Sequence, residues 1–493
     1  MRSAGILLPI SSLPTRYGIG GFSEEAYAFA DRLWEAGQKI WQILPLVPTG
    51  FGDSPYQSFS TFAGNPYLIS LDELCREGLL TGAECREADA GDDPRYVNFG
   101  RVYRTRFAVL GKAFERFSGD AADGYGRFLE ENREWLSDYA LFMAIKEELG
   151  GIPWTDWPEP LRLREEKAIR DKRGELSREI AFQCFLQYEF DVQWKKLKRY
   201  VNGKGIRIFG DMPIYVAMDS ADAWAEPKLF QFNEDLVPEN VAGCPPDGFT
   251  ADGQLWGNPL HNWDYQKRTG YAWWIRRMRR ASGLYDIVRI DHFRGFESYY
   301  SIPYTETTAR NGVWRKGPGI DVFRAVREAC GEVSVVAEDL GYLTDDVRKM
   351  VRDSGYPGMK VLHFAFGSDS QNEYLPHHYE KNCVVYTGTQ DNDTSRGYFE
   401  SASAAEIKFC LNYLGHPDCR EEEFAWTLIR AALASVGDTA IIPMQDYLNL
   451  GTKARMNIPS TQGGLNWRWR MLPGEFDAAL AGRIREVTRL YSR

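Results

Sequence analysis

Short apolar runs closed by polar turns recur along this chain, and helical stretches lie between most of them. Runs of about four to eight residues rich in Val and Ile are typical of buried parallel strands. Three such runs lead to a carboxylate, namely Asp291, Glu338 and Asp391. In an α/β barrel, side chains at the C-terminal ends of the strands converge on one pocket. The pattern therefore predicts an α/β fold whose three acids meet at one site.

The first part of the chain shows the alternation most clearly. Gly5–Pro9 and Lys39–Pro45 are predicted strands, and Ser23–Trp34 is a predicted helix with Ser23 as its N-cap. A strand, a helix and a strand in close succession form a βαβ unit, which implies a parallel sheet. Further strands are predicted over Ile206–Asp211 and Thr439–Pro443, and further helices over Gly319–Cys330, Thr344–Ser354, Ala404–Leu414, Glu421–Val436 and Phe476–Tyr491.

The length of 493 residues exceeds what one barrel needs. Eight βα units take roughly 250 residues, so about half of the chain must be insertions. Helical patterns dominate residues 70–203, where apolar residues recur at three and four positions, the period of one helix face. We expect residues 1–493 to form a single (β/α)8 barrel domain, with a mainly helical inserted subdomain at 70–203 and an inserted active-site loop region at 216–265.

The charge balance excludes some classes of partner. The chain has 59 basic and 69 acidic residues, a net charge of −10. Nucleic acids and anionic membranes bind surfaces of positive potential, so we expect neither as a partner. Aromatic residues make up 14% of the chain, which would suit sugar rings as well as an ordinary core, and composition does not separate these two readings.

Nothing in the sequence indicates a cofactor or a metal. The eight cysteines form no Cys-x-x-Cys pair and no zinc-like spacing. Gly18–Gly21 is not a dinucleotide fingerprint, and Asp391–Asp393 lacks the glycine and the closing Glu of a calcium loop. The N-terminal apolar run is broken by Pro9, and no run reaches membrane-spanning length. We therefore expect a cytoplasmic protein with free thiols and no cofactor.

The residues around the acids suggest different roles for them. Side chains alternate along a strand, so Arg289 and Asp291 point the same way, and the guanidinium is expected to keep Asp291 ionised as a nucleophile. Glu338 follows Val336 and an alanine, and an apolar setting raises a carboxyl pKa as a general acid requires. Two carboxylates in contrasting environments are typical of glycosidic-bond chemistry. The alternatives are a buried structural ion pair and ordinary helix N-caps.

Several segments carry a family resemblance. Ile290–Phe296, Val336–Gly341 and Thr387–Thr394 look like signature segments of the amylomaltases, or 4-α-glucanotransferases, of the α-amylase superfamily. The resemblance runs from about residue 4 to about residue 470. The other segments that carry it are Trp41–Gly50, Gly52–Ser60, Gly210–Ala217, Gly253–Leu260 and Ala454–Pro459.

The resemblance implies a (β/α)8 TIM barrel with inserted subdomains and no C-terminal β-domain. It implies a retaining, double-displacement reaction on maltooligosaccharides, starch or glycogen-derived α-1,4-glucans, with glucose or a glucan as acceptor. Asp291 would be the nucleophile, Glu338 the acid/base and Asp391 the transition-state stabiliser. The residues expected to bind the glucan are Tyr56, Asp211, Asp247, Gln254, Trp256, Arg289, His292, Gln390 and Asn457.

The sequence departs from the family pattern at four positions. Gln390 precedes the third acid where the family usually has His, and Gln can donate a hydrogen bond but cannot become charged. We expect activity to be kept, with an altered donor-site affinity or pH response. Phe51 stands where Tyr is frequent, His363 where Gln is common and Ser460 where Gly is usual.

Two alternative functions stay open at this point. The chain could be an α-1,4-glucan hydrolase of the same superfamily, in which water replaces the acceptor hydroxyl, or a non-catalytic glucan-binding protein that keeps the barrel as a scaffold. The second alternative predicts loss of at least one of the three acids, and all three are present. Trp256 could be a core residue and Asn457 a cap or turn residue. The segment from Ala242 to Trp256 is expected to wall the site against water.

Overall fold

An eight-stranded parallel sheet forms the centre of the protein in its computed structural model, which describes residues 2–89, 93–119, 124–246, 250–341 and 343–493. The strand order is β10-β11-β12-β1-β2-β3-β6-β9. The backbone N–H of Ala337 on β9 donates to the carbonyl oxygen of Pro357, just before β10, at 2.9 Å, so the two ends of this order meet. The sheet is therefore a closed (β/α)8 barrel, as predicted. Its strands are β1 (Ser3–Leu7), β2 (Ile40–Gln42), β3 (Arg207–Met212), β6 (Ile287–Ile290), β9 (Val335–Ala337), β10 (Gly358–Val361), β11 (Cys383–Tyr386) and β12 (Thr439–Pro443).

Two glycines let other parts of the chain approach barrel strands closely. A Cβ at Gly5 on β1 would lie 2.5 Å from the carbonyl oxygen of Ile40, and one at Gly210 on β3 would lie 2.1 Å from the Tyr285 ring. Both distances are too short for real contacts, so only glycine fits. The Tyr285 hydroxyl in turn accepts the backbone N–H of Leu46, in the segment that follows β2, at 3.1 Å. The glycine at 210 thus allows β3 to pack tightly just before Asp211.

Most predicted elements are present, with two local differences. Strand β10 was not predicted, because Gly358–Val361 contains a glycine and a lysine and lacks a Val/Ile-rich run. Ser23 is the N-cap residue of the first helix, but its hydroxyl donates to the Glu25 carboxylate instead of capping the backbone. The helices that alternate with the barrel strands are α1 (Glu24–Glu35), α12 (Ala272–Leu284), α13 (Asp321–Cys330), α14 (Asp345–Ser354), α15 (Ser395–Ser401), α16 (Ala404–Leu414), α17 (Glu421–Ala434), α18 (Met444–Tyr447) and α19 (Ala478–Leu490).

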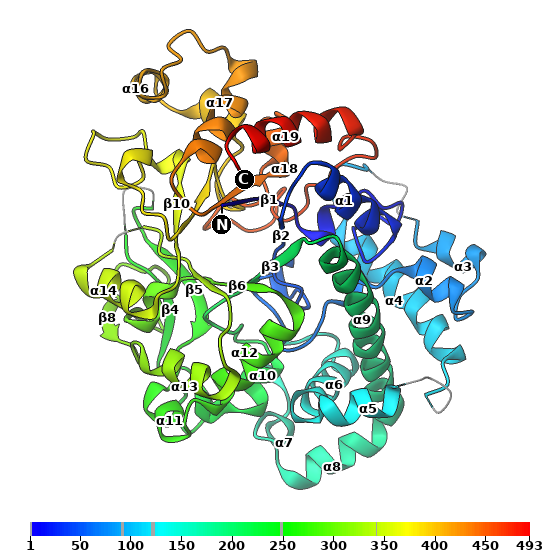
Figure 1. Ribbon diagram of the computed structural model, residues 1–493. Coiled ribbons are helices and arrows are strands. Elements are labelled where there is room, and N and C mark those ends of the chain that lie inside the picture. Colours follow the sequence, from blue (N-terminus) through cyan, green and yellow to red (C-terminus); the bar gives the residue numbers. More distant parts are fainter. Residues whose placement is uncertain (1, 90–92, 120–123, 247–249, 342) are drawn as a thin grey trace.

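A block of helices lies between β2 and β3 and is seen at the right and bottom of Figure 1. Its last helix, α9 (Ser177–Gly203), runs back to the barrel, where the indole N–H of Trp194 donates to the carbonyl oxygen of Leu284 at 3.1 Å. The other helices of the block are α2 (Leu71–Arg76), α3 (Gly82–Glu87), α4 (Phe99–Arg116), α5 (Tyr125–Glu131), α6 (Arg133–Glu148), α7 (Glu159–Arg162) and α8 (Glu166–Glu175).

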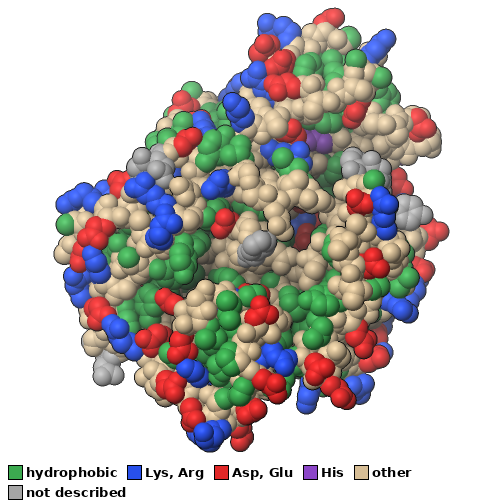
Figure 2. Space-filling view, turned by 180° about the vertical axis from the view of Figure 1, so that it is seen from behind, with side chains coloured by type: hydrophobic (Ala, Val, Ile, Leu, Met, Phe, Trp, Pro, Cys, Tyr) green, Lys and Arg blue, Asp and Glu red, His purple; other side chains and the backbone are tan. Residues whose placement is uncertain are grey.

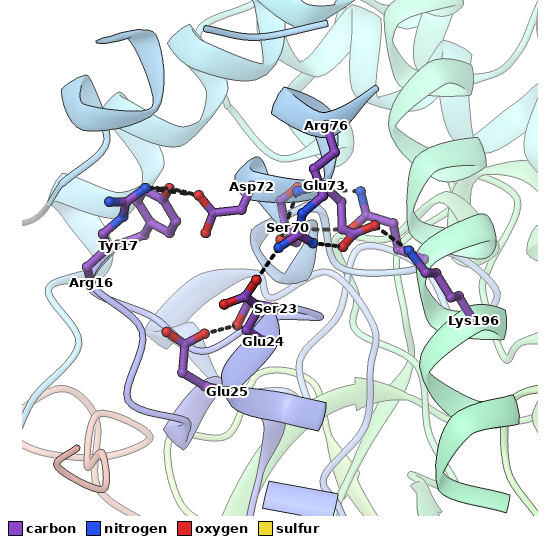
Figure 3. A network of polar contacts seen from close by, with 11 residues as sticks. Arg16, Tyr17, Ser23, Glu24, Glu25, Ser70, Asp72, Glu73, Arg76 and Lys196 are labelled. Carbon is purple, nitrogen blue, oxygen red and sulfur yellow. Dashed lines mark hydrogen bonds and ion pairs between the residues drawn. The ribbon is translucent and has the colours of Figure 1, made fainter. Parts of the chain in front are cut away.

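A polar network fastens this block to the first barrel helix (Figure 3). Asp72 accepts hydrogen bonds from Arg16 at 2.9 Å and from the Tyr17 hydroxyl at 2.6 Å. Glu73, which is 7% exposed, pairs with Arg76 and with Lys196 of α9. Arg76 also reaches Glu24 at the start of α1. The network therefore joins α1, α2 and α9, which lie far apart in the sequence.

A second, antiparallel sheet has the strand order β5-β4-β7-β8. Its strands are β4 (Asn240–Cys244), β5 (Gln254–Pro259), β7 (Ser298–Pro303) and β8 (Val313–Lys316). Residues 216–265 were expected to be loop, and no strand was predicted at 298–303 or 313–316. Because these strands are short and pair across the β6 segment, local patterns do not reveal them. The region also contains α10 (Ala221–Ala225) and α11 (Trp263–Arg268).

All eight cysteines are free thiols. Within the described ranges, no helix is long and apolar enough to cross a membrane.

The buried carboxyl group of Glu189 indicates that the fold loses stability as the pH becomes alkaline. This α9 side chain is 3% exposed, and its Oε2 atom has no hydrogen-bond partner among the described residues. Burial raises the pKa of Glu189 to about 8, whereas glutamate in an unfolded chain titrates near ~4.3. The unfolded state therefore loses this proton first, and stability is lost as pH rises from about 4.3 toward 8. We expect Glu189→Gln to raise the free energy of unfolding at pH 8 by about 1–3 kcal/mol, and by much less at pH 5.

Urea unfolding at both pH values tests this expectation. Glu328→Gln, on the exposed face of α13, is the matched control and should show the same small effect at pH 5 and pH 8. An equal gain from Glu189→Gln at both pH values would contradict the assignment of a buried proton to Glu189.

Candidate active site

The three acids lie at the C-terminal edge of the barrel, but not in equivalent positions. Asp291 directly follows β6 and Glu338 directly follows β9, its neighbour in the sheet. Asp391 was also expected at a strand end, yet β11 ends at Tyr386 and Asp391 lies on the loop beyond it. The protein is hollowed near the middle of the face shown in Figure 2, where acidic side chains are visible. The barrel therefore delivers two acids directly, and a loop delivers the third.

Arg289 is the centre of the polar contacts. Its side chain is 2% exposed, and its Nη2 atom lies 2.8 Å from Oδ1 of Asp291, as the strand alternation predicts. Its Nη1 atom also donates to both carboxylate oxygens of Asp211, at 2.9 and 2.7 Å. The register of β3 and β6 places Asp211 directly opposite Arg289. One buried guanidinium is thus shared by two carboxylates from neighbouring strands.

This sharing changes the expected ionisation of Asp291. Arg289 was expected to lower the pKa of Asp291, and it does act in that direction. Burial raises the pKa of Asp291 more than Arg289 lowers it, and the nearby charges of Asp211, Glu338 and Asp391 raise it further. The net direction is upward, which corrects the prediction. The Asp291 side chain is 27% exposed, so part of it is open to solvent.

The surroundings of Glu338 are more polar than its sequence neighbours suggest. Burial raises its pKa, as predicted, while Arg289 and two backbone donors oppose that rise. The donors are the N–H of Leu340, 2.8 Å from Oε1, and the N–H of His292, 2.7 Å from Oε2. His292 has a φ of 50°, which is uncommon for a residue other than glycine. This left-handed turn directs the His292 N–H at Glu338 and holds the two acids beside each other.

Asp391 is held by three partners from two segments. Asn457 donates its Nδ2 to Oδ1 at 2.7 Å, and Gln390 donates its Nε2 to Oδ2 at 3.1 Å. Arg455 donates to the backbone carbonyl of Asp391 at 2.6 Å. Asn457 was expected to contact the glucan or to act as a cap, and here it contacts the acid itself. The prediction missed Arg455, although it lies two residues before Asn457 in a segment that carries the resemblance.

A line of hydrogen bonds connects the third acid to the guanidinium. Besides Asp391, Gln390 Nε2 also contacts the Tyr56 hydroxyl at 3.0 Å, and that hydroxyl donates to Asp211 Oδ2 at 2.7 Å. Gln390 is 4% exposed, and its Oε1 atom has no partner among the described residues. The line joins Asp391, Gln390, Tyr56 and Asp211 to Arg289, so residues from four segments form one unit. Gln390 leaves one buried acceptor for a ligand hydroxyl.

Trp256 and His292 form an aromatic side of the site. Their ring centroids are 4.9 Å apart and nearly perpendicular, and Gln254 accepts the Trp256 indole N–H at 3.0 Å. Trp256 is only partly buried. Burial lowers the pKa of His292 to about 3, so the ring is neutral, and its Nε2 has no partner in the part of the chain that the structure describes. Asp247, the remaining predicted site residue, lies outside the described residues.

The other departures from the family pattern have structural settings of their own. His363 is 6% exposed, stacks on Tyr398 with centroids 4.7 Å apart and lies 3.2 Å from the Ser395 hydroxyl. Ser460 has a φ of 63°, a conformation that glycine adopts more readily. The Phe51 side chain lies outside what the structure describes. Across the described ranges, no group of three or more His, Cys, Asp or Glu residues could hold a metal ion.

Comparisons with known proteins agree along almost the whole chain. The family model described as 4-alpha-glucanotransferase matches residues 8–475. A relative named 4-alpha-glucanotransferase from Clostridium butyricum is 48% identical, covering 98% of this chain and 99% of the relative, and one from Thermus thermophilus is 47% identical, covering 100% and 99%. The solved structure of amylomaltase from Streptococcus agalactiae in complex with acarbose has a TM-score of 0.96 and 41% identity over 100% of both chains. Amylomaltase from Corynebacterium glutamicum has a TM-score of 0.81 at 19% identity, covering 99% of this chain and 75% of its own, and shows the fold alone.

Three neutral histidines predict an acid-sensitive fold. Burial lowers the pKa of His261, His292 and His363 to about 3, whereas an unfolded histidine titrates near ~6.5. Below that pH the unfolded state binds more protons, so stability is lost as pH falls from about 6.5 toward 3. Between pH 7 and pH 5, we expect His363→Gln to lose about 2 kcal/mol less stability than the parent protein.

Urea unfolding midpoints at pH 7 and pH 5 check this value. His416→Gln, at an exposed position beyond α16, is the control for a histidine outside the core. Identical losses in the parent protein and in His363→Gln would rule out the proposed contribution of His363.

Proposed function

Because this chain belongs to the 4-alpha-glucanotransferase family, we propose that Asp291, Glu338 and Asp391 carry out its reaction. The protein transfers α-1,4-glucan segments from a donor to the 4-hydroxyl of an acceptor glucan or glucose. The observation that most supports the assignment is the Arg289 contact, which orients one Asp291 oxygen at 2.8 Å and leaves the side chain 27% exposed. Maltooligosaccharides and starch-type glucans are the proposed substrates.

In the first step, the free oxygen of Asp291 attacks the anomeric carbon of the donor sugar. The bond between that carbon and the leaving glycosidic oxygen breaks, and Glu338 gives its proton to this oxygen. The product is a covalent glucosyl ester on Asp291. Arg289 keeps the attacking carboxylate in place, and the buried ion pair with Asp211 holds Arg289 itself.

In the second step, the 4-hydroxyl of the acceptor attacks the same carbon. Glu338 takes the proton of this hydroxyl, and the bond to Asp291 breaks, so the α-configuration is retained. Formation of the ester removes one negative charge beside Glu338. The pKa of Glu338 therefore falls in the intermediate, which keeps it ionised and ready to act as the base.

Asp391 stabilises the positive charge that develops on the donor sugar. Its two oxygens already accept hydrogen bonds from Asn457 and Gln390, so the carboxylate is oriented before substrate binds. The unpartnered Oε1 of Gln390 is a suitable acceptor for a hydroxyl of the same sugar. Tyr56, Trp256, Gln254 and His292 supply the surfaces against which the glucan lies.

A hydrolase would carry out the same first step and use water in the second. The partly buried Trp256 favours exclusion of water, because its ring packs against His292, whose backbone N–H donates to Glu338. Cytoplasmic placement stays a prediction from the free thiols.

Incubation with maltotriose separates transfer from hydrolysis. We expect glucose together with a ladder of longer maltooligosaccharides, without a matching rise in reducing ends.

Asp291→Asn should lower the initial rate by roughly a thousandfold or more while leaving the thermal unfolding transition in place. Asp353→Asn, on α14, is the control. Turnover in Asp291→Asn close to that of the parent would exclude Asp291 as the nucleophile.

Asn457 is expected to act through Asp391. Its hydrogen bond lowers the pKa of Asp391, against the upward effect of burial. Asn457→Ala should therefore move the acid limb of the pH–rate profile to higher pH, and it should lower kcat about tenfold with a smaller change in KM. Asn412→Ala, exposed on α16, should leave the profile unchanged. A rise in KM alone would instead indicate that Asn457 acts only by contacting the sugar.

A further inference from the structure

Trp314 is an exposed tryptophan on β8, the edge strand of the second sheet. Its side chain is 41% exposed. The guanidinium carbon of Arg294 lies 3.9 Å from the centre of the indole, and the Tyr300 ring lies 5.1 Å away at 61°. Arg294 therefore covers one face of the indole, and Tyr300 contacts it from the neighbouring strand. The ring is held in place while a large part of its surface stays open to solvent.

The support beneath Trp314 belongs to the catalytic segment. Arg294 is three residues after Asp291, so their Cα atoms are at most ~11 Å apart. The turn that precedes Arg294 wraps around Glu338: the N–H of His292 donates to Oε2, and the N–H of Phe293 donates to the Glu338 backbone carbonyl at 3.0 Å. Trp314 is thus attached to the segment that holds the acid/base.

This attachment places Trp314 on the acceptor side of the site. Glu338 gives its proton to the leaving oxygen and takes one from the acceptor, so the sugars on its side belong to the leaving or the incoming glucan. In the proposed function the donor sugar lies against Asp391, the carboxylate that Asn457 and Gln390 hold. The second sheet is continuous between the two regions, since Trp314 pairs with Tyr300, Tyr300 with Gly243, and Gly243 with Leu255 beside Trp256.

We propose that the open face of Trp314 is an outer binding platform for acceptor glucans, beyond the sugar that receives the transferred segment. The apolar C–H face of a glucose ring stacks on an aromatic plane, and an indole already immobilised by Arg294 loses little freedom on binding. We expect the occupant of this platform to be the same glucan chain that binds at the active site, because Trp314 and Trp256 belong to one sheet. This inference rests on the proposed function.

Acceptor length tests the platform. An α-maltosyl fluoride whose terminal 4-hydroxyl is blocked serves as the donor, because it can give its sugar but cannot accept one. Glucose and maltopentaose are compared as acceptors. Trp314→Ala should raise the KM for maltopentaose roughly three- to tenfold relative to the KM for glucose, as expected for the loss of one stacking contact. Trp314→Phe should restore most of the preference.

The matched control is Trp34→Ala. Trp34 is 59% exposed on α1 and has Lys204 over its ring at 5.7 Å, but α1 and β8 lie on opposite sides of the protein (Figure 1). Its removal should leave the ratio of the two KM values unchanged. The inference is overturned if Trp314→Ala changes neither KM, or changes both equally. Release of fluoride by the parent protein without acceptor reports the first chemical step, so its absence would instead refute the proposed function.

Discussion

One buried guanidinium shared by two carboxylates is the interaction on which the site depends. Arg289 is almost fully buried between Asp211 and Asp291, and a buried cation is tolerated only when its charge is compensated. Removing either acid would take away one of the two negative charges that compensate the Arg289 guanidinium. The pair also joins β3 to β6, so the position of the nucleophile is a property of two neighbouring strands. The hydrogen bonds through Tyr56 and Gln390 extend this constraint to Asp391 on the opposite side of the barrel.

The parts of the protein outside the barrel hold this unit in place. Asp446 accepts hydrogen bonds from Thr387 and Ser395, which fixes both ends of the loop that carries Asp391. In the helical block, Lys146 pairs with Asp219, beyond the end of β3, and the network around Glu73 ties α9 to α1. These segments therefore support the loops at the C-terminal edge of the barrel. Such support is what allows preorganised groups to stabilise charge without reorganising during the reaction.

The success of prediction differed between the two halves of the site. Asp291 and Glu338 lie at strand ends that the sequence predicts, because Val/Ile-rich runs and strand alternation are local properties. Asp391 lies on a loop, and its partners Asn457 and Arg455 come from more than 60 residues away along the chain. β10 and the second sheet were missed, because a strand containing Gly and Lys, or one paired with a strand distant in sequence, has no distinctive local pattern.

The ionisation of the acids shows the same division. Contact between Arg289 and Asp291 follows from their spacing of two residues, and the strand-end positions of two acids follow from periodicity, so the sequence by itself determined the fold class, the family and the candidate catalytic residues. Only the tertiary structure decided that Asp211 shares the guanidinium, that burial raises the pKa of Asp291 against it, and that two backbone N–H groups face Glu338. The physical reason is that a pKa depends on every charge and dipole within a few ångströms, and most of these neighbours are distant in sequence.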